Sequence, residues 1–246
     1  MLEKNKHTAI VLAAGKGRRM EMQVPKQYLS LGGKPLLYYS LKAFEENDDI
    51  KHIILAVGKN EIDFNQENII KKFSFSKISQ VVEGGESRWE SVYEALKKVK
   101  QRGTIWIHDS SRPFLTQEIL KKCKEESERF AALTVAVPAK DTIKQVDENH
   151  MITKTLERKY LWQTQTPQVF SFYVLWQAYQ KFLQEDDAIK STITDDAMIV
   201  EKWTDLAVKI VMGDYHNIKI TTKEDLETGE THLLRIKEKL GTICSN

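Results

Sequence analysis

The most informative chemical pattern in the sequence is a glycine loop followed by basic side chains. Gly15 and Gly17 directly follow a short apolar run, and Arg18, Arg19 and Lys26 come soon after. Glycine lets backbone N–H groups approach phosphate oxygens closely, arginine can hold a phosphate with two hydrogen bonds, and lysine adds a compact charge. The loop therefore predicts a phosphate site that suits a reaction building negative charge on a phosphoryl group.

Two common phosphate loops do not match this one. A P-loop ends in Gly-Lys-Ser or Gly-Lys-Thr, which is missing here. A dinucleotide loop needs a third small residue where Met20 stands, and an acidic residue where Gly58 and Lys59 follow the second strand. These differences disfavour a nicotinamide-dependent oxidoreductase. From the loop alone, a glycine turn with solvated basic residues remains open.

The composition is that of an ordinary globular protein. The 246 residues are 41% hydrophobic and 29% charged, with a formal net charge of only +2, so we expect neither a nucleic-acid nor a membrane partner. Cys123 and Cys244 lie too far apart to suggest a metal site or a disulfide framework. Residues 1–7 are polar and lack a signal-peptide core, so we expect a cytoplasmic protein.

Apolar runs that alternate with helical patterns predict the fold class. Short runs bounded by turn residues suit buried parallel strands, and the stretches between them carry apolar residues at helical spacing. The strands are expected at 9–14, 52–57, 78–82, 104–109 and 132–137, and the helices at 34–47, 87–100 and 116–129. We therefore predict an α/β fold with a Rossmann-like, mostly parallel sheet flanked by helices.

The alternation breaks at residues 139–161, where we predict a projecting β-hairpin arm. Residues 142–146 and 151–155 read as strands joined by a turn at 147–150. An isolated two-stranded hairpin is marginal in water, so we expect a homodimer formed through this arm.

No linker or repeat divides the chain, which favours one domain over residues 1–246. Beyond the arm, helices are expected at 171–184, 194–203 and 222–240, and strands at 207–212 and 217–221.

Further motifs give the glycine loop a family context. The sequence resembles the cytidylyltransferases that act on 2-C-methyl-D-erythritol 4-phosphate, in the family's own order, from about residue 8 to residue 227. The matching stretches are 12–20, 25–28, 84–91, 108–113, 141–144, 165–168, 194–197 and 217–221. The resemblance implies a nucleotide-diphospho-sugar transferase type of fold. It also implies transfer of CMP from CTP to the polyol phosphate, with release of pyrophosphate, in isoprenoid precursor synthesis by the non-mevalonate route.

The resemblance also implies roles for individual residues. The residues expected to bind CTP are Ala13, Ala14, Gly15, Gly17, Arg18, Gly85, Glu86, Arg88, Ser91, Asp109 and Ser110. Those expected to act in catalysis are Arg19, Lys26, Arg158 and Lys219. Those expected to bind the acceptor are Asp109, Arg112, Thr142, Arg158, Thr166, Thr194 and Lys219, some of them reaching across the dimer. Plain surface roles for Arg88, Ser91 and Lys219, and a capping role for Asp109, remain open.

The expected cofactor is Mg²⁺, or another divalent cation, chelated mainly by the CTP phosphates, and no residue is assigned as a metal ligand. His108 has no nucleophile pattern beside it, so a structural role is favoured, and residues 185–187 are expected to form a solvated loop.

One departure from the family pattern concerns the choice of acceptor. Ser110 and Ser111 stand where the commoner family pattern has two alanines. A related enzyme, ribitol 5-phosphate cytidylyltransferase, uses nearly the same loops and is the alternative. The first glycine loop and residues 161–166 look closer to the methylerythritol enzymes. A non-catalytic nucleotide-binding regulator is a remote third possibility.

Overall fold

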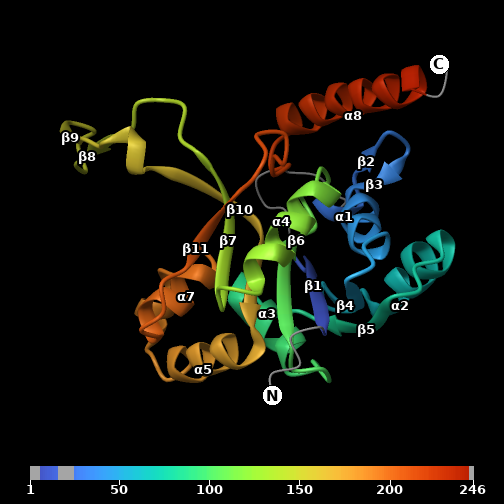
Figure 1. The fold of residues 1–246 in the computed structure, drawn as a ribbon, viewed down its shortest axis with the longest axis horizontal. Coiled ribbons are helices and arrows are strands. Elements are labelled where there is room, and N and C mark those ends of the chain that lie inside the picture. The colour runs from blue at the N-terminus through green and yellow to red at the C-terminus, as the bar shows by residue number, and fades with distance from the viewer. Residues whose placement is uncertain (1–5, 16–24, 244–246) are drawn as a thin grey trace.

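The protein is built around a seven-stranded sheet (Figure 1). The computed structural model describes residues 6–15 and 25–243. Across the sheet the strands are β11 (Lys209–Met212), β7 (Ala132–Pro138), β10 (Trp162–Ser171), β6 (Thr104–Asp109), β1 (His7–Ala13), β4 (Ile50–Val57) and β5 (Ile78–Glu83). β10 runs antiparallel to β6 and β7, whereas the other neighbouring pairs are parallel. The predicted α/β fold with a mostly parallel sheet is confirmed.

Helices cover both faces of this sheet because its central strands are apolar on both sides. Along β1, Ala9 and Val11 pack with helices α1 (Leu36–Glu45) and α4 (Gln117–Ser127), whereas Ile10 points to the opposite face. That second face is covered by α3 (Arg88–Leu96), α5 (Phe172–Phe182) and α7 (Asp196–Trp203). The two layers fix the carboxyl ends of β1, β5 and β6 relative to one another.

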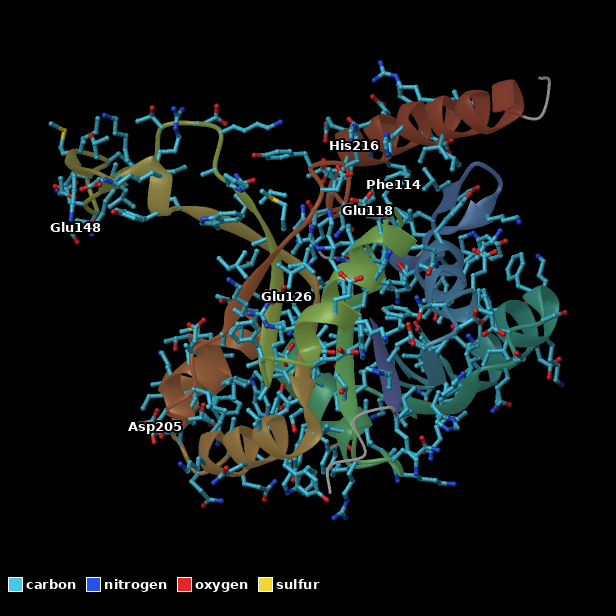
Figure 2. All side chains as sticks on the ribbon, in the orientation of Figure 1. Phe114, Glu118, Glu126, Glu148, Asp205 and His216 are labelled. Atoms are coloured by element: carbon cyan, nitrogen blue, oxygen red, sulfur yellow. The ribbon has the colours of Figure 1, made fainter. Side chains whose placement is uncertain are left out.

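The predicted hairpin arm is present and extends away from the sheet (Figure 1). Strands β8 (Lys144–Val146) and β9 (Ile152–Thr155) pair antiparallel, and all their residues are exposed. In Figure 2 the arm reaches furthest from the body near Glu148. None of the helices that the structure describes combines the length and apolar character needed to span a membrane.

Some elements differ from the sequence prediction. The strand predicted at 217–221 is wrong, because this segment bonds to the loop after β6 through single contacts, such as Ile220 N to Ser111 O at 2.8 Å. Residue 187 of the predicted acidic loop begins a short helix, α6 (Asp187–Ser191), which the Asp186 carboxylate caps. The elements that were not predicted are β10, α2 (Ile62–Asn65), which continues as a wider helical turn over Gln66–Lys71, and the hairpin of β2 (Ser30–Leu31) and β3 (Lys34–Pro35).

The C-terminal helix, α8 (Lys223–Ile243), packs on the β2–β3 hairpin. Leu233 and Leu31 share a small apolar cluster, and the Gly32 amide donates to the Glu230 carboxylate at 2.8 Å. This contact holds the chain after Lys26 beside the chain after Lys219.

Candidate active site

A cavity of about 390 Å³ opens at the carboxyl end of β1. There β1 lies between β4 and β6, where the strand order reverses, which is the usual ligand position in open α/β sheets. The cavity is lined by Leu12, Ala14, Gly15, Lys26, Gln27, Gly85, Glu86, Ser87, Arg88, Ser91, Asp109, Ser110, Ser111 and Lys219. Most of the predicted CTP-binding residues therefore meet in one place, together with both of the predicted catalytic lysines.

One wall of the cavity is the glycine loop between β5 and α3. A Cβ on Gly84 would lie 2.5 Å from both Ala14 Cβ and Ser91 Oγ, and a Cβ on Gly85 would overlap the Glu90 side chain. Only glycine lets this loop pack so closely against the end of β1. Helix α3 then begins with a capping box, in which Ser87 and Glu90 satisfy each other's backbone N–H groups.

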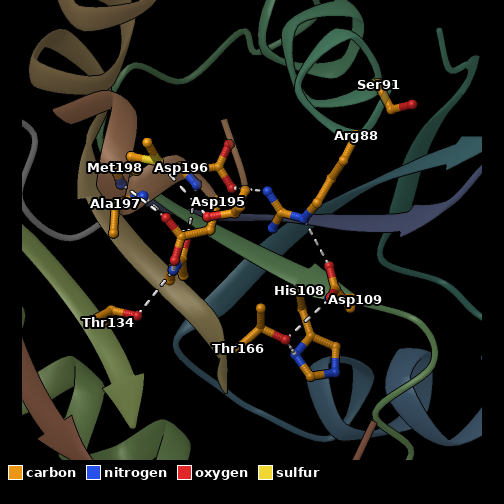
Figure 3. Close-up of polar contacts among 12 residues, drawn as sticks. Arg88, Ser91, His108, Asp109, Thr134, Thr166, Asp195, Asp196, Ala197 and Met198 are labelled. Carbon is orange, nitrogen blue, oxygen red and sulfur yellow. Dashed lines mark hydrogen bonds and ion pairs between the residues drawn. The ribbon is translucent and has the colours of Figure 1, made fainter. Parts of the chain in front are cut away.

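The floor of the cavity carries a set of paired charges (Figure 3). Asp109 ends β6, and its carboxylate accepts from Arg88 Nε at 3.1 Å and from Lys219 Nζ at 2.6 Å. Arg88 also donates through Nη1 to Asp196 at 2.6 Å, at the start of α7. Residues far apart in the chain thus form one continuous group of ion pairs.

The charge state of Asp109 follows from these neighbours. Burial alone raises the pKa of the carboxyl, but the attraction of Arg88 and Lys219 more than offsets it, so its pKa lies well below the usual range. Asp109 is therefore ionised at neutral pH. Its side chain is 11% exposed, and it can meet a ligand only from the cavity.

His108, the preceding residue, holds Asp109 in place from behind. Its Nδ1 lies 2.9 Å from Thr166 Oγ1, which accepts from the Asp109 amide at 3.1 Å, and its Nε2 lies 3.1 Å from the Arg112 carbonyl. These partners suit a neutral ring with its proton on Nε2. Burial lowers the pKa of His108 to about 4, which is consistent with the predicted structural role.

Other predicted residues lie outside the cavity lining. Ala13 and Thr166 are buried beside it, and Arg112 donates to the Asn217 and Thr164 carbonyls at 2.8 and 3.2 Å. Thr194 is exposed just before α7, where its hydroxyl contacts the Met198 sulfur.

The predicted arm residues also lie outside the cavity lining. Thr142 is exposed, and Arg158 donates to the Lys140 carbonyl at 2.7 Å, at the base of the arm. Gly17, Arg18 and Arg19 lie outside the described residues.

Sequence reasoning missed several residues of the site. Leu12, Gln27, Ser87 and Ser111 line the cavity without having been given a binding role. Gln27 lies inside the Pro25–Tyr28 motif, and the spacing of Ser87 from Glu90 is the mark of a capping box. Asp196 lies in the motif at 194–197, in which only Thr194 was given a predicted role.

The carboxylates in the cavity lining suit a cation that arrives with its substrate. Among the residues that the structure describes, no group of three or more His, Cys, Asp or Glu side chains could hold a metal ion. Asp109 and Glu86 are the acidic residues of the lining. Mg²⁺ commonly keeps several waters and binds through one or two carboxylates plus substrate phosphates, so this site fits it.

A family comparison agrees with this geometry. The model of the family described as 2-C-methyl-D-erythritol 4-phosphate cytidylyltransferase matches residues 7–235. The chain belongs to this family. It is therefore an enzyme of the cytidylyltransferase class within the nucleotidyltransferases.

Relatives in this family match the chain over most of its length. A 2-C-methyl-D-erythritol 4-phosphate cytidylyltransferase from Lachnospira eligens is 44% identical over 221 residues, which is 90% of this chain and 96% of the relative. One from Caldanaerobacter subterraneus is 44% identical over 227 residues, which is 92% and 98%.

A solved structure shares the fold. The 4-diphosphocytidyl-2C-methyl-D-erythritol synthase of Anaerococcus prevotii superposes with a TM-score of 0.82 at 30% identity. The match covers 94% of this chain and 100% of that one. The cytidylyltransferase fold is therefore the scaffold on which the cavity is built.

Proposed function

We propose that this cytidylyltransferase transfers CMP from CTP to 2-C-methyl-D-erythritol 4-phosphate in the non-mevalonate route to isoprenoid precursors. An oxygen of the acceptor phosphate attacks the α-phosphorus of CTP and forms a new P–O bond. The bond from that phosphorus to the bridging oxygen breaks, and pyrophosphate leaves. The observation that carries the proposal is the single cavity in which the Gly15 and Gly85 loops meet Lys26, Asp109 and Lys219.

The nucleoside end of the cavity suits a pyrimidine. The backbones at Ala13, Ala14 and Gly85 would hold the cytosine, with the Ser91 side chain beside them. Close packing between the two loops leaves little room for a larger base, since even a Cβ on Gly84 would meet Ala14 and Ser91. Glu86, Arg88, Asp109 and Ser110 complete the CTP-binding set.

The phosphate end supplies positive charge. Lys26 and Arg19 would neutralise the α-phosphate as the transition state forms, with Gly15, Gly17 and Arg18 on the other phosphates and Lys219 toward the acceptor. A divalent cation, Mg²⁺ in our proposal, supplies further charge neutralisation when it is bound with CTP. Catalysis then consists of positioning and electrostatic stabilisation, without a covalent enzyme intermediate.

The acceptor site requires a second copy of the chain. Thr142 and Arg158 lie on the arm, outside the cavity lining of their own chain. The arm also exposes apolar side chains, with Met151 66% and Ile152 62% exposed, as a protein interface would need. We propose a homodimer of single-domain chains in which the arm, about residues 139–161, brings Thr142 and Arg158 to the partner's cavity.

Residues of the same chain complete the acceptor site. Asp109, Arg112, Thr194 and Lys219 would contact the acceptor directly. The Thr166 hydroxyl is already bonded to His108 and to the Asp109 amide, so it would act on the acceptor through Asp109.

The decisive experiment compares two acceptors. Pyrophosphate release is timed with CTP, Mg²⁺ and either 2-C-methyl-D-erythritol 4-phosphate or ribitol 5-phosphate. We expect faster turnover of the methylerythritol substrate and no release without an acceptor. Faster turnover of ribitol 5-phosphate would overturn the choice of acceptor, and release with neither acceptor would overturn the assigned activity.

The second candidate activity is cytidylyl transfer to ribitol 5-phosphate, and the observation that favours it is the pair Ser110 and Ser111. Both line the cavity where the commoner family pattern has alanine. Ribitol 5-phosphate carries one more hydroxyl than methylerythritol phosphate, and an added serine could bind it. We expect the single variant Ser111→Ala to keep its methylerythritol turnover and to lose residual ribitol turnover, with Ser110 left in place because it belongs to the proposed CTP-binding set. A variant that instead turns over ribitol 5-phosphate faster would contradict this role.

A further inference from the structure

A chain of buried polar side chains runs from the far helices to the cavity. Tyr179, on α5, donates its hydroxyl to Asp196 at 2.6 Å, and the other Asp196 oxygen accepts from Arg88 Nη1 at 2.6 Å. Arg88 Nε then reaches Asp109. Figure 3 shows the Arg88 guanidinium between the two carboxylates. Tyr179 and Asp196 are both fully buried, and neither lines the cavity.

Asp196 is itself held on several sides. Its amide and that of Ala197 both donate to Gln168 Oε1, at 3.0 and 3.2 Å, on β10. The Gln168 amide nitrogen in turn donates to Asp195, whose carboxylate also caps α7 at Met198. The Asp196 carboxylate therefore offers Arg88 a fixed partner, because the backbone that carries it is bonded to the sheet.

The position of Asp109 depends on Arg88, which bonds to both Asp109 and Asp196. An arginine with one carboxylate partner can swing with that partner, whereas one held between two carboxylates has a fixed place. Arg88 and Lys219 together balance the charges of Asp109 and Asp196. Asp109 then holds Lys219 through the ion pair of 2.6 Å. Removing the far carboxylate would leave Arg88 to follow Asp109 alone, and would loosen the cavity floor.

We propose that Asp196, supported by Tyr179, is a positioning residue that fixes Arg88 and thereby places Asp109 and Lys219 for the acceptor. This inference rests on the proposed function, since the acceptor is 2-C-methyl-D-erythritol 4-phosphate. It predicts that the two buried residues govern acceptor binding without touching any substrate.

The test removes one oxygen atom at a time. Tyr179→Phe takes away only the hydroxyl bonded to Asp196. Tyr93→Phe is a matched control, because its ring stacks on Tyr179 at 6.0 Å but its hydroxyl is only within 3.4 Å of the Gln180 amide on the exposed side. We expect Tyr179→Phe to raise the KM for the acceptor about tenfold, the lower end of the range seen when a group supporting a metal ligand is lost. The KM for CTP should rise less, because Gly15, Gly85 and Lys26 line the cavity independently of Arg88. Tyr93→Phe should change neither constant.

A larger rise in the KM for the acceptor than in the KM for CTP separates a positioning effect from a loss of stability. A partly unfolded variant lowers kcat through the amount of active enzyme but does not change either KM. Equal behaviour of Tyr179→Phe and Tyr93→Phe, or an equal rise in both KM values, would overturn the inference. Failure of the wild-type enzyme to turn over methylerythritol phosphate is a distinct result, and it would overturn the proposed function and this inference with it.

A double-mutant cycle tests the route through Arg88. In Arg88→Lys the ammonium can pair with only one of the two carboxylates, so the link to Asp196 is already lost. Tyr179→Phe should then add no further rise in the acceptor KM. Independent, multiplying effects would show that Tyr179 acts by another route and would contradict the proposal.

Discussion

Lys26 and Lys219 come from opposite ends of the sequence, yet both line the same cavity. Their residue types and their motifs pointed to the site, because phosphate chemistry calls for lysine and arginine. The pairing of Asp109 with Arg88 and Lys219, and of Arg88 with Asp196, could not be predicted in the same way. Each pair joins residues whose approach depends on how α3, α7 and the segment after β11 pack on the sheet.

At the scale of single residues, we expect loss of the Lys26 charge to slow the chemical step. Lys26→Ala should lower kcat about 10²–10³-fold, as removal of one group that stabilises transition-state charge does in other enzymes. Lys59→Ala, which removes an exposed lysine after β4, is the control and should leave kcat unchanged. Turnover is followed by pyrophosphate release. A Lys26→Ala enzyme as fast as the control would remove Lys26 from the mechanism.

His108 predicts a pH dependence of stability. The unfolded chain binds this proton below about pH 6.5, but the folded protein binds it only near pH 4, because burial lowers the pKa of the ring. The free energy of unfolding should therefore fall by about 3 kcal/mol as the pH drops through this window, at about 1.4 kcal/mol per pH unit.

Urea unfolding between pH 7 and pH 4 measures this change. His108→Gln should flatten the curve in that range, since it removes the titrating group. His150→Asn, at the exposed turn of the arm, should leave the curve as it is in the wild type. Parallel curves for the wild type and His108→Gln would refute the assignment.

Among the elements, α3 connects the glycine loop to the buried charges. Its capping box at Ser87 sets the point where the helix begins, one residue before Arg88.

Helix and strand positions that carry apolar periodicity were predicted well, as β1, β4 and α3 show. β10 was missed because the polar residues Gln165, Thr166 and Gln168 are typical of an exposed loop. In the structure all three are buried, and their side chains form hydrogen bonds with other parts of the protein. The strand predicted at 217–221 is wrong for the opposite reason. Its alternating apolar residues are typical of a strand, but they pack in the interior without strand-to-strand hydrogen bonding.

The cap of α3 should therefore matter to ligand binding as well as to stability. Ser87→Ala removes the side-chain acceptor for Glu90 N and should cost about 1 kcal/mol of unfolding free energy. Because the cap also shapes the cavity wall, the KM for CTP should rise. Thr116→Ala, which removes the cap of α4 away from the cavity lining, should cost a similar amount of stability with no change in KM. Identical KM values in the two variants would contradict a link between the cap and the CTP site.

At the scale of the whole molecule, our proposal gives the arm a role in completing the acceptor site of a second copy of the chain. Its hairpin was predictable from two short strand patterns around a turn. The position of Arg158 relative to a cavity was not, because in our proposal that cavity belongs to another copy of the chain. The exposed apolar side chains of the arm support the proposed homodimer, because a partner surface would bury them.

Disrupting the arm should separate the copies and stop the reaction together. We expect the double variant Met151→Glu, Ile152→Glu to sediment as a monomer and to release pyrophosphate at least about 10²-fold more slowly, since misplaced binding groups cost rates of this order. Leu206→Glu, an exposed leucine in the loop after α7, is the control for added charge and should stay dimeric and active. A fully active monomer would exclude a shared acceptor site.

The most direct test of the account is a crystal structure of the chain with CTP and Mg²⁺ and no acceptor. We predict cytosine between the Gly15 and Gly85 loops, and the triphosphate within hydrogen-bonding reach of Lys26. CTP bound elsewhere, or in this cavity with its α-phosphate turned away from Lys26, would contradict the account.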